Sequence, residues 1–392
     1  MSHAGGLDDR DDSGRLLSLD AFRGVAIAGM VLVNNPGDWS ALYPPLAHAR
    51  WHGWTFTDCI FPFFLFIVGV SMVLSTRRRA AAGDDSAALL LGLWRRAALI
   101  VLIGLLLNQI PRFDLATLRI PGVLQRIGLC VALAAPVVLL TRPRAWVAWI
   151  VALFVAYGVP MLLVPVPDAS GAVAAGVLEP GRDFGAWVDR LLLGGHLWSA
   201  SKTWDPEGLV STLPAVATLL FGALTGHGLL TRAPAAEKTA WVFAAGLALL
   251  GLGTLLDAVL MPINKSLWTP SYAVFMAGWA LLAFGLCYWL LDAAPQPAVR
   301  ATARRLLLPL VIYGMNALFV FVLSGLVAKA LASFTVMADD VRSVSWKAWT
   351  FEPLAALPVS AEARSLLWAL GFQALMFGVA WWMWRRRWFV KI

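Results

Sequence analysis

Residues 56–79 of the chain read FTDCIFPFFLFIVGVSMVLSTRRR, an apolar run that ends in three consecutive arginines. A helix of about 20 apolar residues, rising about 1.5 Å per residue, is long enough to cross the hydrocarbon core of a bilayer, which is about 30 Å thick. Arginines that directly follow such a run mark its cytoplasmic end. This stretch therefore predicts a transmembrane helix that leaves the membrane on the cytoplasmic side.

The composition extends this prediction to the whole chain. Hydrophobic residues make up 60% of the 392 residues and charged residues only 14%, whereas a soluble domain carries about 25% charged residues. The mean hydropathy is +0.74. Because so little polar surface cannot cover a water-soluble globule of this size, we expect an all-α integral membrane protein.

Further apolar runs of similar length predict a bundle of about ten transmembrane helices. We place the spans at 16–35, 55–76, 90–107, 122–141, 145–165, 209–230, 239–261, 270–292, 306–332 and 364–385. An even number of spans puts both termini on one side, and the arginine triplets at 77–79 and 385–387 make that side the cytoplasm. The polar residues 1–14 are expected to form a disordered cytoplasmic tail, and 15–392 a single transmembrane domain.

The net charge of +8 is also found in proteins that bind nucleic acid. Here the basic residues lie in short clusters between apolar runs, which is the pattern of cytoplasmic loops. We therefore expect the lipid bilayer, and no nucleic acid, as a partner. The cysteines Cys59, Cys130 and Cys287 show no CxxC spacing and are predicted to be small buried residues.

The first predicted span opens with SLDAFRG, residues 18–24. Asp20 and Arg23 are three residues apart, so they share a helix face and can pair. An arginine one turn inside a span costs about 3 kcal/mol unless it is paired or hydrated. The pair is either an interfacial salt bridge that anchors the helix or part of a functional site, and the sequence leaves both open.

The loop after the first span reads VNNPGDWSALYPPLAHARWHGWTFTD, residues 33–58, and lies on the outer face in the predicted topology. A histidine near a membrane surface is suited to general-base catalysis because its ordinary pKa is about 6.5. A neighbouring aspartate can orient the ring. His48 and Asp58 are therefore candidates for catalysis, and the alternative is that His48 is only a hydrogen-bonded loop residue.

A metal site is a further alternative for the same loop. His48 and His52 would share a face of a helix, and Asp58 would complete a triad of ligands. The spacing is not accompanied by an HExxH motif, and no cysteine lies close enough to join the site. We therefore expect no metal.

Four later motifs also bring polar side chains into or beside predicted spans. They are PGVLQRIG (121–128), WDPEG (204–208), NKSLW (264–268) and YGMNAL (313–318). Buried polar groups in lipid need partners. These side chains either join helices to one another or line a polar cavity through the bundle, and their number favours the cavity.

In this order, SLDAFRG, VN, HARWHGWTFTDCIFPFFLFIVGVS, IPGVLQRIG, WDPEG, NKSLWTPSY and GMNAL resemble the motifs of the heparan-α-glucosaminide N-acetyltransferase family of transmembrane acyltransferases. The ordered set is specific and runs from about residue 16 to about residue 322. The resemblance implies a multi-pass enzyme of the bacterial inner membrane, forming a homodimer. It would move acetyl from cytosolic acetyl-CoA to the amine of a glucosamine-type sugar on the periplasmic side.

The resemblance also carries residues over to this chain. The family's proposed active-site histidine lies in a motif like HAxWNGxTxxD and corresponds to His48, while the motif's aspartate corresponds to Asp58 and the asparagine of VN to Asn34. This sequence departs at His52, where the family usually has asparagine, which argues against a required role for His52. The large lumenal domain of the animal enzyme has no counterpart here, so we expect a sugar other than heparan.

The implied roles follow from the chemistry of a thioester. His48 would be the general base or a transient acetyl carrier, Asn34 the oxyanion donor, and Asp58 the residue that sets the tautomer of His48. The residues expected to bind acetyl-CoA are Arg23, Asp20 and Asn316. Those expected to bind the acceptor are Trp51, Asp205, Glu207, Gln125, Arg126 and Lys265.

A membrane carrier for sugars or lipid-linked glycan intermediates is the alternative function. A carrier is expected to have paired discontinuous helices in two related halves, and the sequence has no internal repeat. An enzyme needs a polar cluster at one mouth of the bundle, and residues 34–58 supply it. The sequence leaves open the acceptor sugar and whether transfer is direct or passes through acetyl-histidine.

Overall fold

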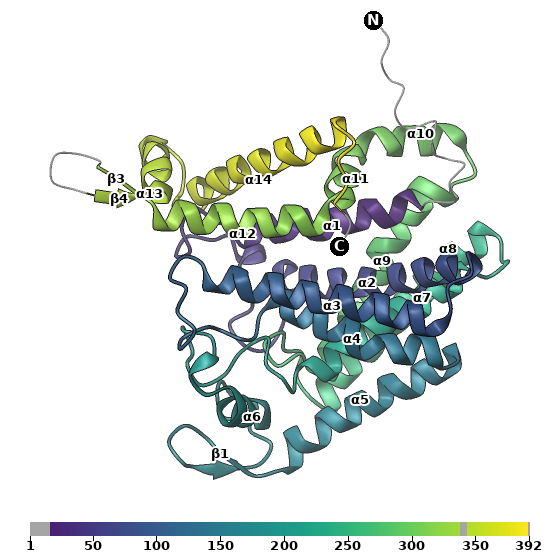
Figure 1. The fold of residues 1–392 in the computed structure, drawn as a ribbon, viewed down its shortest axis with the longest axis horizontal. Helices are drawn as coiled ribbons and strands as arrows, with labels where there is room; N and C mark the ends of the chain where they lie inside the picture. Colours follow the sequence, from purple (N-terminus) through teal and green to yellow (C-terminus); the bar gives the residue numbers. More distant parts are fainter. Residues whose placement is uncertain (1–15, 338–342, 391–392) are drawn as a thin grey trace, which may run out of the picture.

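The computed structural model describes residues 16–337 and 343–390, and the predicted tail at 1–14 lies outside them. Most of the described chain is helical, and the long helices lie side by side in one bundle (Figure 1). The α-helices are α1 (Leu17–Val33), α2 (Phe56–Ala81), α3 (Ser86–Gln109), α4 (Val123–Leu140), α5 (Pro143–Leu163), α6 (Phe184–Leu193), α7 (Thr212–Leu229), α8 (Ala235–Val259), α9 (Pro270–Tyr288), α10 (Pro297–Leu306), α11 (Leu308–Met315), α12 (Ala317–Ser333), α13 (Trp346–Phe351) and α14 (Ala361–Arg385).

Short elements complete the described chain. One antiparallel pair is β1 (Val166–Pro167) with β2 (Val173–Ala174), and another is β3 (Thr335–Met337) with β4 (Ser343–Ser345). The short helical turns are η2 (Pro44–Leu46), η3 (Gly194–His196), η4 (Trp289–Ala293) and η5 (Glu352–Ala356). The hairpins, α6 and α13 all lie at one end of the bundle, on the left of Figure 1, which we call the loop end.

Within the described residues, eight helices are long and apolar enough to cross a membrane, so the chain is a multi-pass membrane protein. They are α2, α3, α4, α5, α7, α8, α9 with η4, and α14. The pair α11 and α12 makes a ninth if it counts as one span. The first predicted span falls on α1, which has 17 residues. The count of ten crossings and the cytoplasmic position of both ends stay predictions.

The span predicted at 306–332 is not one continuous helix. It breaks at Asn316, where α11 and α12 meet at 82°. Asn316 leaves helical geometry with φ −124° and ψ 34°. Its amide binds the backbone of the C-terminal segment instead, donating to the carbonyl of Trp388 at 3.0 Å and accepting from the N–H of Val390 at 2.9 Å. The C-terminal segment thus supplies partners at the bend.

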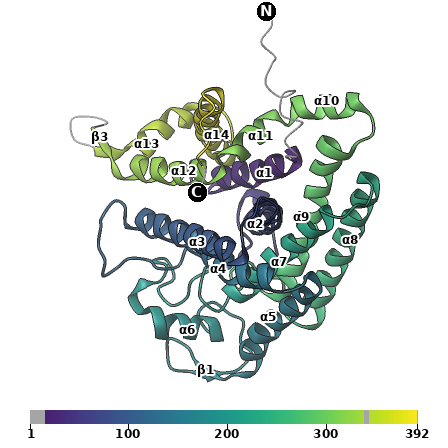
Figure 2. The same ribbon diagram turned by 45° about the vertical axis from the view of Figure 1, so that its right-hand side comes forward.

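Helix α2 is the centre of the bundle and is seen nearly end-on in Figure 2. It contacts α1, α3, α4, α7 and α9, and 83% of its most apolar stretch is buried. Glycines bring it close to α7: a Cβ on Gly69 would lie 2.0 Å from the carbonyl oxygen of Leu219, and one on Gly222 would lie 1.9 Å from that of Phe66. Small residues of this kind let membrane helices approach closely, since apolar side chains gain little by leaving lipid.

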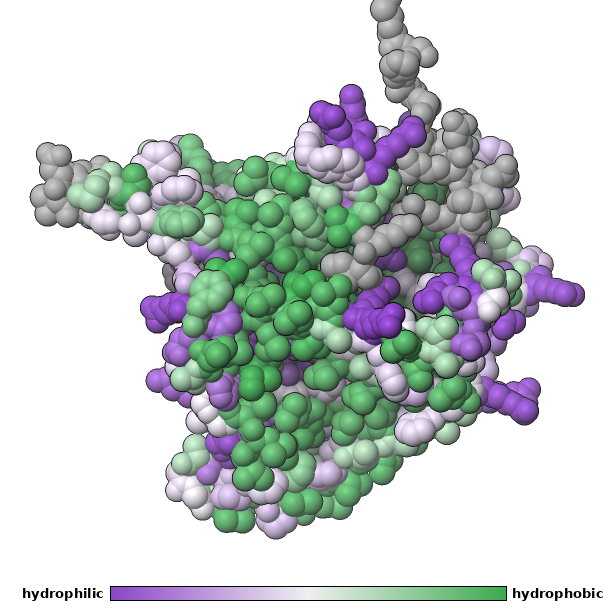
Figure 3. Space-filling model, viewed as in Figure 1, coloured by the Kyte–Doolittle hydropathy of each residue, from purple (hydrophilic) through white to green (hydrophobic). Residues whose placement is uncertain are grey.

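The outer helices present apolar side chains to the surroundings. Only 28% of α3, α5 and α14 and 17% of α8 is buried over the stretch most suited to a membrane. In Figure 3 hydrophobic side chains form a broad belt across the middle of the visible face, and hydrophilic ones gather toward its ends. This distribution matches a bundle whose rim faces lipid.

Candidate active site at the loop end of the bundle

His48 and Asp58 form a direct pair. The Nδ1 atom of His48 lies 2.6 Å from Oδ1 of Asp58, and the His48 side chain is 47% exposed while that of Asp58 is 1% exposed. When Nδ1–H donates to the carboxylate, Nε2 carries the lone pair that can accept a proton. The structure therefore brings together the two residues expected from the loop sequence. Their geometry suits His48 as the base and Asp58 as the carboxylate that orients its ring.

The first turn of α2 holds Asp58 in place. Oδ2 of Asp58 accepts from the backbone N–H of Thr55 at 3.0 Å and from that of Ala49 at 3.1 Å. The bond to Thr55 is half of a capping box, in which the start of the helix and the aspartate satisfy each other. Tyr272 of α9 donates its hydroxyl to the Asp58 carbonyl at 2.6 Å. The carboxylate is thus fixed by helix-start chemistry and needs no separate support.

Trp51 and His52 point to other partners. The indole N–H of Trp51 donates to the carbonyl of Leu178 at 2.7 Å, and its ring lies 5.2 Å from the ring of Trp204. Nδ1 of His52 lies 3.4 Å from Nδ2 of Asn264. The two histidines of the loop therefore do not converge. Within the described ranges, no group of three or more His, Cys, Asp or Glu side chains is arranged to hold a metal ion.

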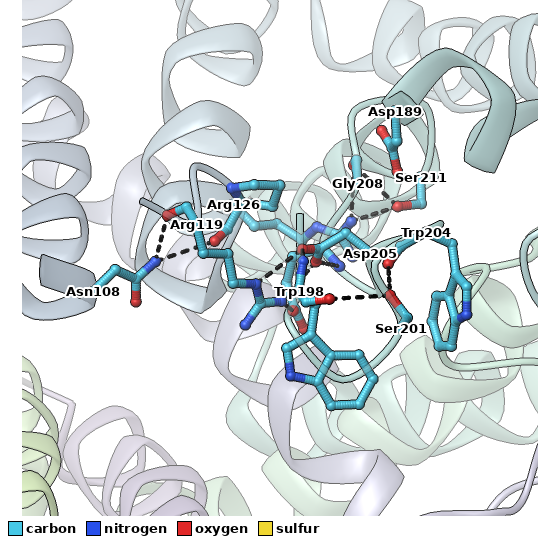
Figure 4. Close-up of polar contacts among 12 residues, drawn as sticks. Asn108, Arg119, Arg126, Asp189, Trp198, Ser201, Trp204, Asp205, Gly208 and Ser211 are labelled. Carbon is cyan, nitrogen blue, oxygen red and sulfur yellow. Dashed lines mark hydrogen bonds and ion pairs between the residues drawn. The ribbon is translucent and has the colours of Figure 1, made fainter. Parts of the chain in front are cut away.

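Arg119 joins the two carboxylates of the WDPEG motif. Its Nε and Nη2 atoms bind Asp205 at 2.9 and 2.6 Å (Figure 4). Nη2 also lies 2.6 Å from Oε2 of Glu207. Asp205 accepts two further backbone N–H groups, from Trp198 at 3.0 Å and from Glu207 at 2.9 Å. The residues expected to bind the acceptor are thus engaged with an arginine from the segment between α3 and α4, which the sequence analysis missed.

Opposite charges in this network favour the charged forms of Glu207 and Arg119. Burial alone would raise the pKa of Glu207, but the charges of Lys265, Arg119 and Arg126 hold that pKa below its usual value. Burial opposes the charge of Arg119, but its bonds and proximity to Asp205 and Glu207 keep its pKa above the usual value. Lys265 also lies near enough to Asp58 for its charge to act on that carboxylate. Lys265 therefore acts electrostatically on both the His48–Asp58 pair and the Arg119–Asp205–Glu207 network.

Arg126, one turn into α4, is almost completely buried at 1% exposed. Its Nη2 atom donates to the carbonyl of Gly208 at 3.0 Å and to the hydroxyl of Ser211, and its guanidinium lies 5.1 Å from the centre of the Trp268 ring. Nε and Nη1 have no hydrogen-bond partner. The neighbouring Gln125 is also buried, and its Nε2 atom has none either.

A small cavity adjoins this network. It is partly open, with about 280 Å³ of empty space when the solvent at its mouth is included, and its lining includes Tyr157, Asp183, Asp189, Trp204, Asp205 and Ser266. Asp189 of α6 is 3% exposed, and burial raises its pKa to about 7, although the N–H of Leu209 donates to it at 2.9 Å. Asp189 was not foreseen, because a single aspartate in an amphipathic segment gives no signal of burial.

The remaining predicted residues are Asn34, Arg23, Asp20 and Asn316. Asn34 is the C-cap of α1 and is exposed. Arg23 pairs with Asp20 at 3.1 Å, as predicted, and donates to Oγ of Ser71 at 2.9 Å. At about 1.5 Å per residue, Ser71 lies about 20 Å along α2 from Asp58. Asn316 is buried at the bend described above.

Residues 15–184 match the family described as "Heparan-alpha-glucosaminide N-acetyltransferase, catalytic". The chain is 30% identical to the Homo sapiens heparan-alpha-glucosaminide N-acetyltransferase over 333 residues, 71% of this chain and 49% of that protein. It is 27% identical to the Mus musculus protein of the same name over 337 residues, 72% of this chain and 50% of that protein. The chain thus spans about half the length of these curated relatives.

Proposed function

We propose that this chain, which belongs to the heparan-alpha-glucosaminide N-acetyltransferase family, moves an acetyl group from acetyl-CoA to the amine of a glucosamine-type sugar across the membrane. The relatives are named for an N-acetyltransferase reaction. The observation that carries the proposal is the His48–Asp58 pair, a general base with its orienting carboxylate at the loop end of a membrane bundle.

The chemistry requires little beyond this pair. A thioester is already activated, so the amine nitrogen attacks the acetyl carbon, the C–N bond forms and the C–S bond breaks. The leaving sulfur departs as CoA thiolate, and the proton lost by the amine goes to Nε2 of His48. Asp58 stabilises the resulting imidazolium. Passage through an acetyl-His48 intermediate uses the same atoms in two steps.

The acceptor would bind at the loop end. The rings of Trp51 and Trp204 meet there, and Lys265, Asp205 and Glu207 supply polar groups beside them. Since Arg119 already engages both carboxylates, we assign Asp205 and Glu207 the task of shaping the site, with their remaining oxygen lone pairs available to sugar hydroxyls. Gln125 and Arg126 belong to the inner wall of the same region.

Acetyl-CoA would enter from the opposite end. Its phosphates carry several negative charges, and Arg23, held by Asp20 about 20 Å along α2 from the base, is the proposed partner on that side. The thin pantetheine arm would then extend along the bundle toward His48. Asn316 contributes indirectly, by fixing the bend between α11 and α12. The bacterial inner membrane and a homodimer complete the proposal.

Replacing His48 by alanine tests the proposal in purified protein supplied with acetyl-CoA and glucosamine. We expect kcat to fall by about 100-fold or more, because the base is lost. The matched control is His52→Asn, which introduces the residue usual in the family and should leave kcat within a few-fold of wild type. Turnover of His48→Ala at the wild-type rate would rule out His48 as the base.

A sugar carrier is the second candidate, and the bent pair of α11 and α12 is the observation that favours it, because carriers use discontinuous helices. Ligand-induced stabilisation separates the two. An acetyltransferase binds CoA in the native state, so millimolar CoA should raise Tm. The rise in Tm is compared with those produced by desulfo-CoA and by free adenosine. No rise in Tm with CoA, together with uptake of sugar into proteoliposomes, would favour the carrier.

A further inference from the structure

Arg126 is a buried cation with donors left over. It is 1% exposed, and two of its nitrogens, Nε and Nη1, have no hydrogen-bond partner. Buried polar groups are nearly always bonded in native proteins, and a guanidinium inside a membrane bundle is expensive unless something compensates it. The unused donors therefore point to a ligand with an acceptor oxygen.

The guanidinium is held rigidly from two sides. Nη2 donates to the carbonyl of Gly208 and the hydroxyl of Ser211, and Cζ lies over the Trp268 ring, 5.1 Å from its centre. These contacts fix the plane of the guanidinium, so the directions of Nε–H and Nη1–H are set before any ligand arrives. Donors that are oriented in advance stabilise a developing charge without having to reorganise.

The surrounding charges favour an anionic oxygen. Arg119, Lys265 and Arg126 all act on Glu207, while the carboxylates bound into this network are Glu207 and Asp205. The ion pairs to both carboxylates are made by Arg119, and not by Arg126. Asp189 also lies near Arg126, but burial raises its pKa to about 7, so it is only partly ionised at neutral pH. Among the described residues Arg126 itself forms no ion pair, so its charge can act on an oxygen that becomes negative beside it.

Arg126 and the proposed base share one framework. The Trp268 ring beneath the guanidinium lies 5.3 Å from the ring of Tyr272, and Tyr272 donates its hydroxyl to the carbonyl of Asp58 at 2.6 Å. Asp58 in turn binds His48. The start of α9 therefore positions the guanidinium and the base relative to each other.

We propose that Arg126 donates its free N–H groups to the carbonyl oxygen of the acyl thioester and stabilises the oxyanion that forms there. The inference rests on the proposed acetyl transfer. As the amine nitrogen bonds to the acyl carbon, the carbonyl π electrons move onto oxygen beside Arg126. When the tetrahedral species collapses, they return, the C–S bond breaks and thiolate leaves. Arg126 keeps all its protons throughout.

Two inert analogues of acetyl-CoA test this assignment directly. S-acetonyl-CoA has a ketone carbonyl, and S-propyl-CoA has a methylene at the same position, so the pair differs in the acceptor oxygen alone. Kd for each is measured by calorimetry in detergent with the full chain. For wild type we expect the ketone to bind about 10- to 100-fold more tightly, as for a charge-assisted hydrogen bond.

The variant for comparison is Arg126→Lys, which keeps the positive charge but loses the planar fork of donors. We expect the preference for the ketone to fall to about 2-fold or less and kcat to fall by about 100-fold, with little change in Kd for S-propyl-CoA. The control is Arg112→Lys, an exposed arginine between α3 and α4, which should behave as wild type. If the role of Arg126 were only structural, Arg126→Lys would weaken the binding of both analogues equally.

The outcomes separate the inference from the proposed function. The inference is overturned if folded Arg126→Lys protein prefers the ketone as strongly as wild type does. It is also overturned if wild-type protein binds both analogues equally, because water and not the carbonyl oxygen would then accept from the free N–H groups of Arg126. Wild-type protein that binds neither analogue and does not acetylate glucosamine overturns the proposed function instead. If Arg126→Lys fails to fold, Arg126→Gln, which retains an N–H donor, takes its place. The ratio of its Kd values for S-propyl-CoA and S-acetonyl-CoA must then be smaller than that of wild type.

Discussion

Nδ1 of His48 lies 2.6 Å from the carboxylate of Asp58, and the same carboxylate closes the capping box that starts α2. One aspartate thus performs two tasks, beginning a transmembrane helix and orienting an imidazole. Because helix caps are local, the direction of the His48 ring depends mainly on the nine residues between the pair, 49–57.

Asp58→Asn should separate these two tasks. Asp58 is the N3 residue of the capping box, and the side-chain oxygen of asparagine can still accept from the N–H of Thr55, so Tm should fall by only a few degrees. It cannot stabilise an imidazolium, so kcat should fall by about 100-fold or more. Steady-state kinetics and a thermal melt on the same preparation measure both. The matched control is Asp85→Asn at the N-cap of α3, which makes the same chemical change and should leave kcat unchanged.

Arg119→Met should be strongly destabilising. It leaves the buried carboxylates of Asp205 and Glu207 without their partner, which costs about 3–5 kcal/mol of unfolding free energy. Denaturation in detergent measures the loss. Adding Asp205→Asn and Glu207→Gln should recover much of it, since the uncompensated charge disappears. Arg182→Met removes the exposed ion pairs of Arg182 with Glu179 and Asp168 and should cost much less. Equal losses for the two arginine variants would contradict this account.

Gly24→Ala should push α1 away from α11. A Cβ at Gly24 would lie 1.8 Å from the carbonyl oxygen of Leu310, and backbone cannot yield as a side chain does. We expect a loss of about 1–3 kcal/mol or more, read as a lower Tm. Gly378→Ala in α14 is the control, because its Cβ would meet open space, and it should leave Tm unchanged or slightly raised.

Asp189 should make stability depend on pH. Burial raises its folded-state pKa to about 7 from an ordinary value of 3.8. Between these values the folded state holds the proton that the unfolded state releases, so the free energy of unfolding falls as pH rises, by about 1.4 kcal/mol per pH unit, and levels off above pH 7. Asp189→Asn should flatten this slope in melts between pH 4.5 and pH 8. Asp114→Asn, at an exposed aspartate, should keep it.

Features that are local in sequence were predictable. Asp20 and Arg23 are three residues apart on one helix, and they pair at 3.1 Å as expected. His48 and Asp58 lie in one loop and the helix that follows it. The long helices were predictable as well, because in lipid the length of an apolar run fixes the length of a span. Each of these predictions needed only neighbouring residues.

Features that depend on distant segments were not predictable. Arg119 meets Asp205 from 86 residues away, and nothing in either segment names the other. The break at Asn316 depends on the backbone of Trp388, and an apolar run gives no sign of it. Arg126 was recognised as polar and inside a span, but its two unpartnered nitrogens emerge only when Gly208 and Trp268 are in place.

The bond between Asn316 and the C-terminal segment has a practical consequence for anyone who labels this protein. The backbones of Trp388 and Val390 hold the bend between α11 and α12 through their hydrogen bonds with Asn316. A fluorescent protein fused without a spacer after Ile392 would strain these hydrogen bonds. A topology reporter is therefore better attached through a long flexible spacer, and a truncation ahead of Trp388 would measure the freedom of the bend as well as the absence of the tail.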